Sequence, residues 1–181
     1  MSMDNDYKIK GSSIRTKFQF VKEKYGDAAE QALQGQFDRS LFPILDSSWY
    51  PFSFNEKISL TIVRAHFAGD MSRLREVGAF SATRVLTSVY KFYATAKGFI
   101  EFLRRAELLH ETCYSKGGMK VDIGGDLKSC DIYLRAPIFS EADMHVAAGF
   151  YEGAAAFFGE TGITCTCAHE GHGAHFHMAW S

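Results

Sequence analysis

Six of the eleven cysteine and histidine residues in this chain lie within its last seventeen positions. Thiolate and imidazole groups are the ligands that zinc prefers in proteins. The clustering therefore predicts a divalent metal site, with zinc as the first candidate. The ligands that we expect are Cys165, Cys167, His169, His172 and His175, with His177 beside them.

The same segment has the pattern of a β-hairpin. Cys165 and Cys167 alternate along one strand, two glycines mark a turn, and His175 and His177 alternate along the return strand. If Cys165 lies opposite His175, both fall on one face of the sheet and four ligands come within reach. The alternative is a solvated, histidine-rich hairpin without metal, because the spacing matches none of the strict zinc-finger patterns.

The bulk properties are those of an ordinary globular chain of 181 residues, with 46% apolar and 23% charged residues. We expect a flexible N-terminus at residues 1–10 and a single domain over residues 11–181. A net charge of −1 gives no electrostatic footprint for nucleic acid. The polar start and the lack of a run of 18 apolar residues predict a cytoplasmic protein with no membrane span.

The first half of the chain has helical periodicity. Helices are expected over Ser12–Tyr25, over residues 27–33, over residues 54–67 and onward from Asp70, with a last one over residues 97–111. The sequence Ser53-x-x-Glu56 predicts a capping box at the start of the helix over residues 54–67.

After His110 the periodicity changes to the alternation of strands. Residues 119–123 and 129–135 flank a Gly-Gly-Asp turn and predict a second β-hairpin. Ser140 is expected to cap a helix over residues 141–158. Gly149 and Gly153 in this helix predict a close approach to a neighbour, which is either the chain's own sheet, the favoured alternative, or a second subunit. The order of elements predicts an α+β fold, in which a helical bundle packs on a small antiparallel sheet made of two β-hairpins.

Aromatic residues are abundant, with 16 Phe, 8 Tyr and 2 Trp. An apolar ligand pocket is the functional interpretation of this composition, and a filled core is the alternative. The candidate pocket residues, all from the helical half, are Phe67, Phe80, Tyr90, Phe92, Phe99 and Phe102.

The C-terminal end resembles the 4-vinyl-reductase domain, which ends in a GFxxG helix, a strand, Cys-x3-Gly-x3-Cys and an alternating strand. Here residues 149–153 read GFYEG, and Cys167, Gly171 and His175 take the later positions. That domain shares a fold superfamily with the haem-NO-binding domains and the TRAPP vesicle-tethering subunits. The upstream half, with WYP before a helix and LREVG after it, is similar to an uncharacterised bacterial family of about this length.

This resemblance implies a cytoplasmic ligand-sensing or scaffold domain that binds a small hydrophobic molecule or a tetrapyrrole between helices and sheet. It also implies a homodimer and a zinc site at the C-terminal cysteines. The chain departs from the pattern, because His175 replaces the second cysteine and the Tyr-x-Ser-x-Arg signature of the haem-NO sensors is absent. No histidine matches their haem ligand. His110 comes nearest, but a packed or surface histidine is the favoured interpretation, so haem is the less favoured cofactor.

No phosphate-binding loop, nucleophile elbow or paired-acid motif is found in the sequence. A binding module for a small apolar ligand, which signals through a partner protein, is therefore favoured over an enzyme. A dimeric scaffold without ligand is the second interpretation. The third is a metal-dependent hydrolase, in which Glu170 between His169 and His172 serves as a general base beside a metal-bound water.

Overall fold

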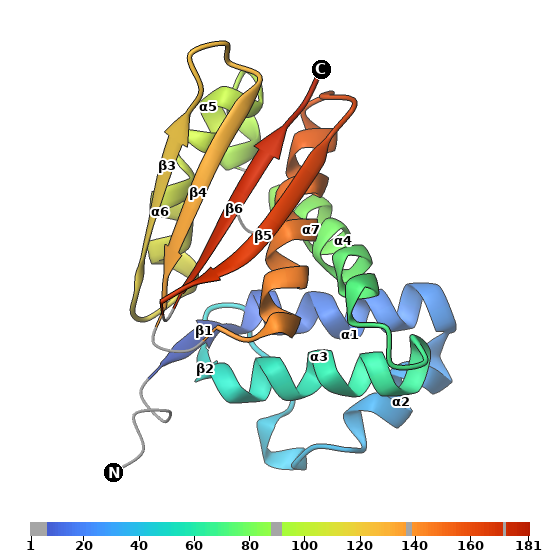
Figure 1. The fold of residues 1–181 in the computed structure, drawn as a ribbon. Coiled ribbons are helices and arrows are strands. Elements are labelled where there is room, and N and C mark those ends of the chain that lie inside the picture. The colour runs from blue at the N-terminus through green and yellow to red at the C-terminus, as the bar shows by residue number, and fades with distance from the viewer. Residues whose placement is uncertain (1–6, 88–91, 137–138, 172) are drawn as a thin grey trace.

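The structure is a computed structural model, and it describes residues 7–87, 92–136, 139–171 and 173–181. Helices and short strands make up the N-terminal part, and two hairpins flank a long helix in the C-terminal part (Figure 1). In chain order the elements are β1 (Lys8–Lys10), α1 (Gly11–Tyr25), α2 (Asp27–Gln34), β2 (Trp49–Pro51), α3 (Phe52–His66), α4 (Leu74–Thr87), α5 (Phe99–Leu103), α6 (Ala106–Cys113), β3 (Gly118–Ile123), β4 (Ser129–Arg135), α7 (Glu141–Phe157), β5 (Thr164–Glu170) and β6 (Gly173–Ala179).

The two expected hairpins form one antiparallel sheet in the order β3-β4-β6-β5, joined where β4 pairs with β6. One face is buried through alternate residues, among them Ile132 and Leu134 of β4 and Phe176 and Met178 of β6. Helix α6 packs against β3 and α7 packs against β5. The fold class predicted from the sequence, α+β with a helical bundle on a two-hairpin sheet, is confirmed.

The N-terminal helices lie beyond one end of the sheet, with α1 and α3 side by side (Figure 1). Strands β1 and β2 form a separate two-stranded sheet, in which Lys8 pairs with Pro51. Of the segment expected to be flexible, Lys8–Lys10 form β1 and residues 1–6 lie outside the described residues.

The predicted capping box at Ser53 is wrong. Helix α3 begins at Phe52, two residues before the predicted start at residue 54, and its N-cap Pro51 makes no side-chain cap. The backbone N–H of Phe52 donates instead to the carbonyl of Tyr7 at 2.9 Å. Pairing of β1 with β2 therefore sets the start of this helix, and such long-range pairing overrides a local capping signal.

The glycines of α7 are in close contact, as predicted, but their neighbour is helix α4 and not the sheet. A Cβ atom added at Gly149 would lie 2.1 Å from the Arg75 carbonyl oxygen, and one at Gly153 would lie 2.6 Å from Ala79 Cα. In return, a Cβ at Gly78 would lie 2.0 Å from the Val146 carbonyl. Small residues on both helices thus let the two backbones touch, which fixes α7 on α4.

The predicted helix over residues 97–111 is divided into α5 and α6 by a turn at residues 104–105. The predicted cap at Ser140 is confirmed, because Ser140 and Asp143 form a reciprocal capping box at the start of α7. Among the helices of the described residues, none combines the length and the apolar character that crossing a membrane requires.

Candidate functional site

A partly open cavity lies inside the domain, where the N-terminal helices meet the sheet and its helices. Its walls come from both halves, with Lys17 of α1 and Asn55 of α3 on one side and His110 of α6 and Asp143 of α7 on the other. The space open to water measures about 100 Å³. Because one water needs roughly 10–15 Å³ of such space, the cavity has room for several waters or a small ligand group. The rest of the wall is largely apolar, with Phe52, Phe102, Leu109, Phe139 and Phe150 among its residues.

Lys17 places a buried ammonium on this wall. Its side chain is only 2% exposed, because residue 17 falls on the apolar stripe of α1 between Ile14 and Val21. The Nζ atom donates to the Asn55 carbonyl at 3.0 Å and to Ser59 Oγ at 2.5 Å. Burial lowers the pKa of Lys17 to about 8, since the charged form loses hydration.

Asp143 places a buried carboxyl group on the same cavity. Its Oδ2 atom accepts hydrogen bonds from Ser140, at 3.2 Å from the backbone N–H and at 2.8 Å from the hydroxyl. Burial raises the pKa of Asp143 to about 6, although the Lys17 charge and the Ser140 hydrogen bonds act in the opposite direction. The capping box therefore holds this carboxyl group at the cavity despite the cost of burying it.

Two further polar atoms on the cavity wall are buried and have no hydrogen-bond partner, namely Asn55 Oδ1 and His110 Nε2. The His110 ring stacks on Tyr114, with ring centroids 4.5 Å apart. Burial lowers the pKa of His110 to about 4, so the imidazole is neutral near pH 7 and its unprotonated nitrogen can act as a metal ligand. Unpaired buried polar atoms are uncommon in proteins, so these two atoms are candidates for binding a polar group of a ligand.

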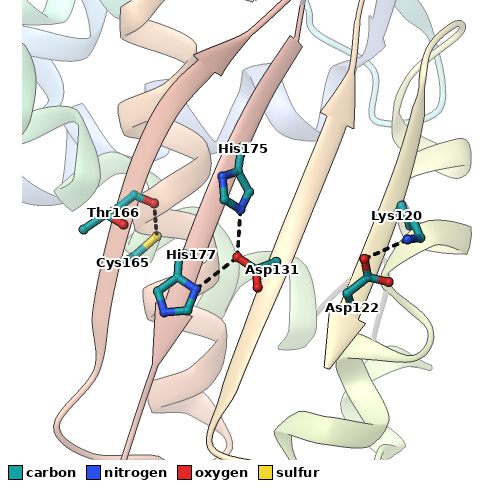
Figure 2. A network of polar contacts seen from close by, with 7 residues as sticks. All are labelled: Lys120, Asp122, Asp131, Cys165, Thr166, His175 and His177. Atoms are coloured by element: carbon teal, nitrogen blue, oxygen red, sulfur yellow. Dashed lines mark hydrogen bonds and ion pairs between the residues drawn. The ribbon is translucent and has the colours of Figure 1, made fainter. Parts of the chain in front are cut away.

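The C-terminal hairpin differs from the expectation in its register. Cys165 pairs with Met178 and Ala168 pairs with His175, so the expected pairing of Cys165 with His175 is wrong by three residues. An odd shift exchanges the two faces of a strand. Cys165 is consequently buried toward the helices, whereas His175 and His177 lie on the outer face beside β4 (Figure 2).

The described residues contain no group of three or more His, Cys, Asp and Glu side chains that could hold a metal ion. Cys167 is half-buried on the face of Cys165, His169 is exposed near the turn, and His172 lies outside the described residues. The zinc site predicted from these residues thus has no support in the structure, because the thiols and the imidazoles of His175 and His177 point to opposite faces.

The outer-face histidines instead share one carboxylate. Asp131 Oδ1 lies 2.7 Å from His175 Nε2 and 3.0 Å from His177 Nδ1 (Figure 2). Partial burial acts to raise the pKa of Asp131, but the hydrogen bonds from the two histidines outweigh it and hold the pKa below its usual value. The His175 ring also stacks on Tyr133 at 4.7 Å, which places the cluster on the exposed face of the sheet.

Among the six aromatic residues proposed to line a pocket, Phe102 does line the cavity. Phe67 and Phe99 are fully buried in the core, where Phe67 contacts Phe20 and Phe99 contacts Trp180. Phe80 is half-buried, Phe92 is 63% exposed, and Tyr90 lies outside the described residues.

Sequence reasoning missed the polar residues of the cavity. One signal was present, because a lysine between Ile14 and Val21 on an apolar helix face is unusual and indicates a buried cation. From the sequence, Asp143 indicates no more than a favourable charge in the first turn of its helix. For His110 the sequence favours a packed or surface histidine.

No known family model and no curated protein sequence matches the chain. Solved structures do match over nearly its whole length. An H-NOX protein from S. oneidensis in the Fe(II)NO ligation state has a TM-score of 0.77 at 11% identity, covering 96% of this chain and 99% of that one. The Fe(II) unliganded H-NOX protein from K. algicida has a TM-score of 0.71 at 16% identity, covering 96% and 97%.

An oxygen-binding H-NOX domain related to soluble guanylate cyclases, in its oxygen complex, has a TM-score of 0.71 at 13% identity and covers 96% of this chain and 95% of that one. At these identities the comparisons show a shared fold. The haem-NO-binding part of the expected resemblance therefore fits at the level of the fold, and the 4-vinyl-reductase and TRAPP parts find no support among these structures.

Proposed function

We propose that this chain is a sensor-type domain that binds a small apolar molecule in its interior cavity, with haem as the first candidate. One observation carries the proposal. Asn55 and His110 line a largely apolar cavity, and each carries a buried polar atom, Oδ1 and Nε2 respectively, that has no hydrogen-bond partner. Ligand pockets have this character, since apolar walls supply affinity and a few polar groups fix orientation.

The chemistry of His110 suits a haem iron. Its imidazole is neutral near pH 7, its Nε2 is free of protein partners, and stacking on Tyr114 restricts the ring. When bound, the iron would supply a site for a diatomic gas, as in the Fe(II)NO and oxygen complexes of the structural neighbours. The cavity of about 100 Å³ is smaller than a macrocycle, so side chains of the cavity wall must move to admit one.

The location of the cavity between the two halves of the domain supports a sensing role. Its walls come from α1 and α3 on one side and from α6 and α7 on the other, so an occupant contacts both halves of the domain. Any displacement of His110 or Asp143 by the ligand is passed to α6 or α7, and α7 is fixed on α4 by its glycines. A signalling partner that reads this change is part of the proposal, as is a homodimer.

Haem reconstitution tests the proposal. Purified protein is mixed with haemin under reducing, oxygen-free conditions, and the Soret band is recorded before and after addition of NO. We expect a saturable, one-to-one spectrum for the wild type and for His66→Ala, whose imidazole stacks on Tyr25 outside the cavity. His110→Ala should lose the histidine-ligated spectrum, and added imidazole should restore it.

If wild type and His110→Ala give the same spectrum, His110 is not the ligand. If haem does not bind at all, the haem part of the proposal fails, and binding of other apolar molecules decides the remainder.

A further inference from the structure

Two side chains of opposite charge line the cavity and do not form an ion pair with each other. Lys17 comes from α1 and Asp143 from α7, and each is nine-tenths or more buried. No contact within 4.0 Å joins the Lys17 ammonium to the Asp143 carboxylate, although both are fully described in the structure. We infer that these two residues, with Asn55, select an apolar ligand that carries a neutral hydroxyl or amide group. This inference rests on the proposed function in its general form, that the cavity binds a small apolar molecule, and it concerns an occupant other than haem, whose carboxylates the site would disfavour.

Each of the three groups has hydrogen-bonding capacity left. An ammonium has three N–H donors, and Lys17 uses two, on the Asn55 carbonyl and on Ser59 Oγ. Both hydrogen bonds from Ser140 to the Asp143 side chain go to Oδ2, so Oδ1 remains an acceptor for a ligand. Asn55 Oδ1 is buried and has no donor. The ligand group that fits accepts one hydrogen bond from Lys17 and donates to Asp143 or Asn55.

Charge excludes the ionic alternatives. A ligand carboxylate would approach Lys17 but would also meet the buried carboxylate of Asp143, with the charge of Glu56 acting on the same residues. A ligand ammonium would meet Lys17. Uncompensated charge is costly in a buried site, because hydration is lost and not replaced. A hydroxyl or amide carries no net charge and contains both a donor and an acceptor, so it satisfies the site without repulsion.

The experiment compares three ligands that share one apolar chain, namely decanol, decanoate and decylamine. Each displaces the neutral fluorescent probe N-phenyl-1-naphthylamine from the purified full chain near pH 7, where Asp143 is ionised and Lys17 is charged. For the wild type we expect decanol to displace the probe at concentrations at least about tenfold lower than the two ionic ligands.

Removing either charge of the cavity should change which of the three ligands binds most tightly, and the two variants should favour opposite ionic ligands. Asp143→Asn leaves Lys17 without its opposing carboxylate, so decanoate should become the tightest ligand. Lys17→Met leaves Asp143, so decylamine should become the tightest. Ser140 remains able to cap α7 in Asp143→Asn, because Ser140 Oγ accepts from the backbone N–H of residue 143. The asparagine oxygen can still accept the return hydrogen bond from the Ser140 N–H.

The order of the three ligand affinities in the wild type tests the inference even if a variant fails to fold. Equal displacement by the three ligands, or tightest displacement by an ionic one, overturns the selectivity while the proposed binding function stands. A probe that does not bind the wild type, with no displacement to measure, overturns the binding function and the selectivity together.

Discussion

Between about pH 4 and pH 6, two buried groups of the cavity, Asp143 and His110, should change the free energy of unfolding in opposite directions. In the folded chain the pKa of Asp143 is raised from 3.8 to about 6, and that of His110 is lowered from 6.5 to about 4. Each shift is about two pH units or slightly more, and one unit corresponds to about 1.4 kcal/mol, so each group contributes roughly 3 kcal/mol across its range. We predict that the two contributions nearly cancel in the wild type.

The directions follow from proton binding. Between about pH 4 and 6, folded Asp143 keeps a proton that the unfolded chain has released, so its contribution to stability falls as the pH rises. His110 acts in reverse, because the unfolded chain holds a proton that the buried imidazole lacks, and stability rises with pH. Asp143→Asn should therefore gain stability from about pH 4 to pH 6, relative to wild type. His110→Gln should lose stability over the same range.

Urea unfolding of the three proteins at about pH 4 and about pH 6 measures these differences. The remaining titrating groups are common to all three, so the change in each variant relative to wild type isolates one residue. We expect differences of opposite sign, each up to roughly 3 kcal/mol. Identical pH dependence in the three proteins would refute the burial of these two groups, and with it the electrostatics assigned to the cavity.

Other predictions concern packing and the outer face of the sheet. Gly149→Ala should lower the free energy of unfolding by about 1–3 kcal/mol in urea titrations, because its Cβ would lie 2.1 Å from the Arg75 carbonyl oxygen. Gly118→Ala, whose Cβ would meet nothing within 4 Å, is the control and should change stability by less than about 0.5 kcal/mol; equal effects of the two would show that α4 and α7 do not touch at Gly149. Asp131→Asn should cost less than about 1 kcal/mol near pH 7, because the side chain is 35% exposed. The Asp131 carboxylate stabilises the wild type only while it is ionised, so this contribution should vanish as the pH falls through its lowered pKa. Acidification should therefore destabilise Asp131→Asn less than the wild type. An equal loss of stability in the two proteins would contradict the assigned contacts with His175 and His177.

Local patterns gave reliable predictions of local structure. Alternation with a glycine turn identified both hairpins, and the Ser140 cap depends only on residues within one helical turn. The glycine spacing of α7 predicted a close contact but did not reveal its partner, since α4 lies about seventy residues away in sequence. The capping box at Ser53 failed for the same reason, because pairing of β1 with β2 starts the helix at Phe52.

The candidate site was harder to predict than the fold. Whether Cys165 faces His175 depends on the register of β5 on β6. The observed register pairs Glu170 with Gly173 and Cys165 with Met178, which differs from the expected pairing by an odd number of residues. The cavity joins Lys17, Asn55, His110 and Asp143 from four helices, and no spacing in the sequence brings them together. The homodimer and the signalling partner remain predictions.

The most direct test of the account is to fill the cavity and measure binding. Ala106 is 3% exposed and lines the cavity, whereas Ala156 is exposed on α7. Affinity for N-phenyl-1-naphthylamine is measured by fluorescence titration in the wild type, Ala106→Leu and Ala156→Leu, with thermal unfolding recorded for each. We predict that Ala106→Leu remains folded and binds at least about tenfold more weakly, while Ala156→Leu binds like the wild type. Unchanged affinity in a folded Ala106→Leu would show that the ligand binds elsewhere and would contradict the interior site.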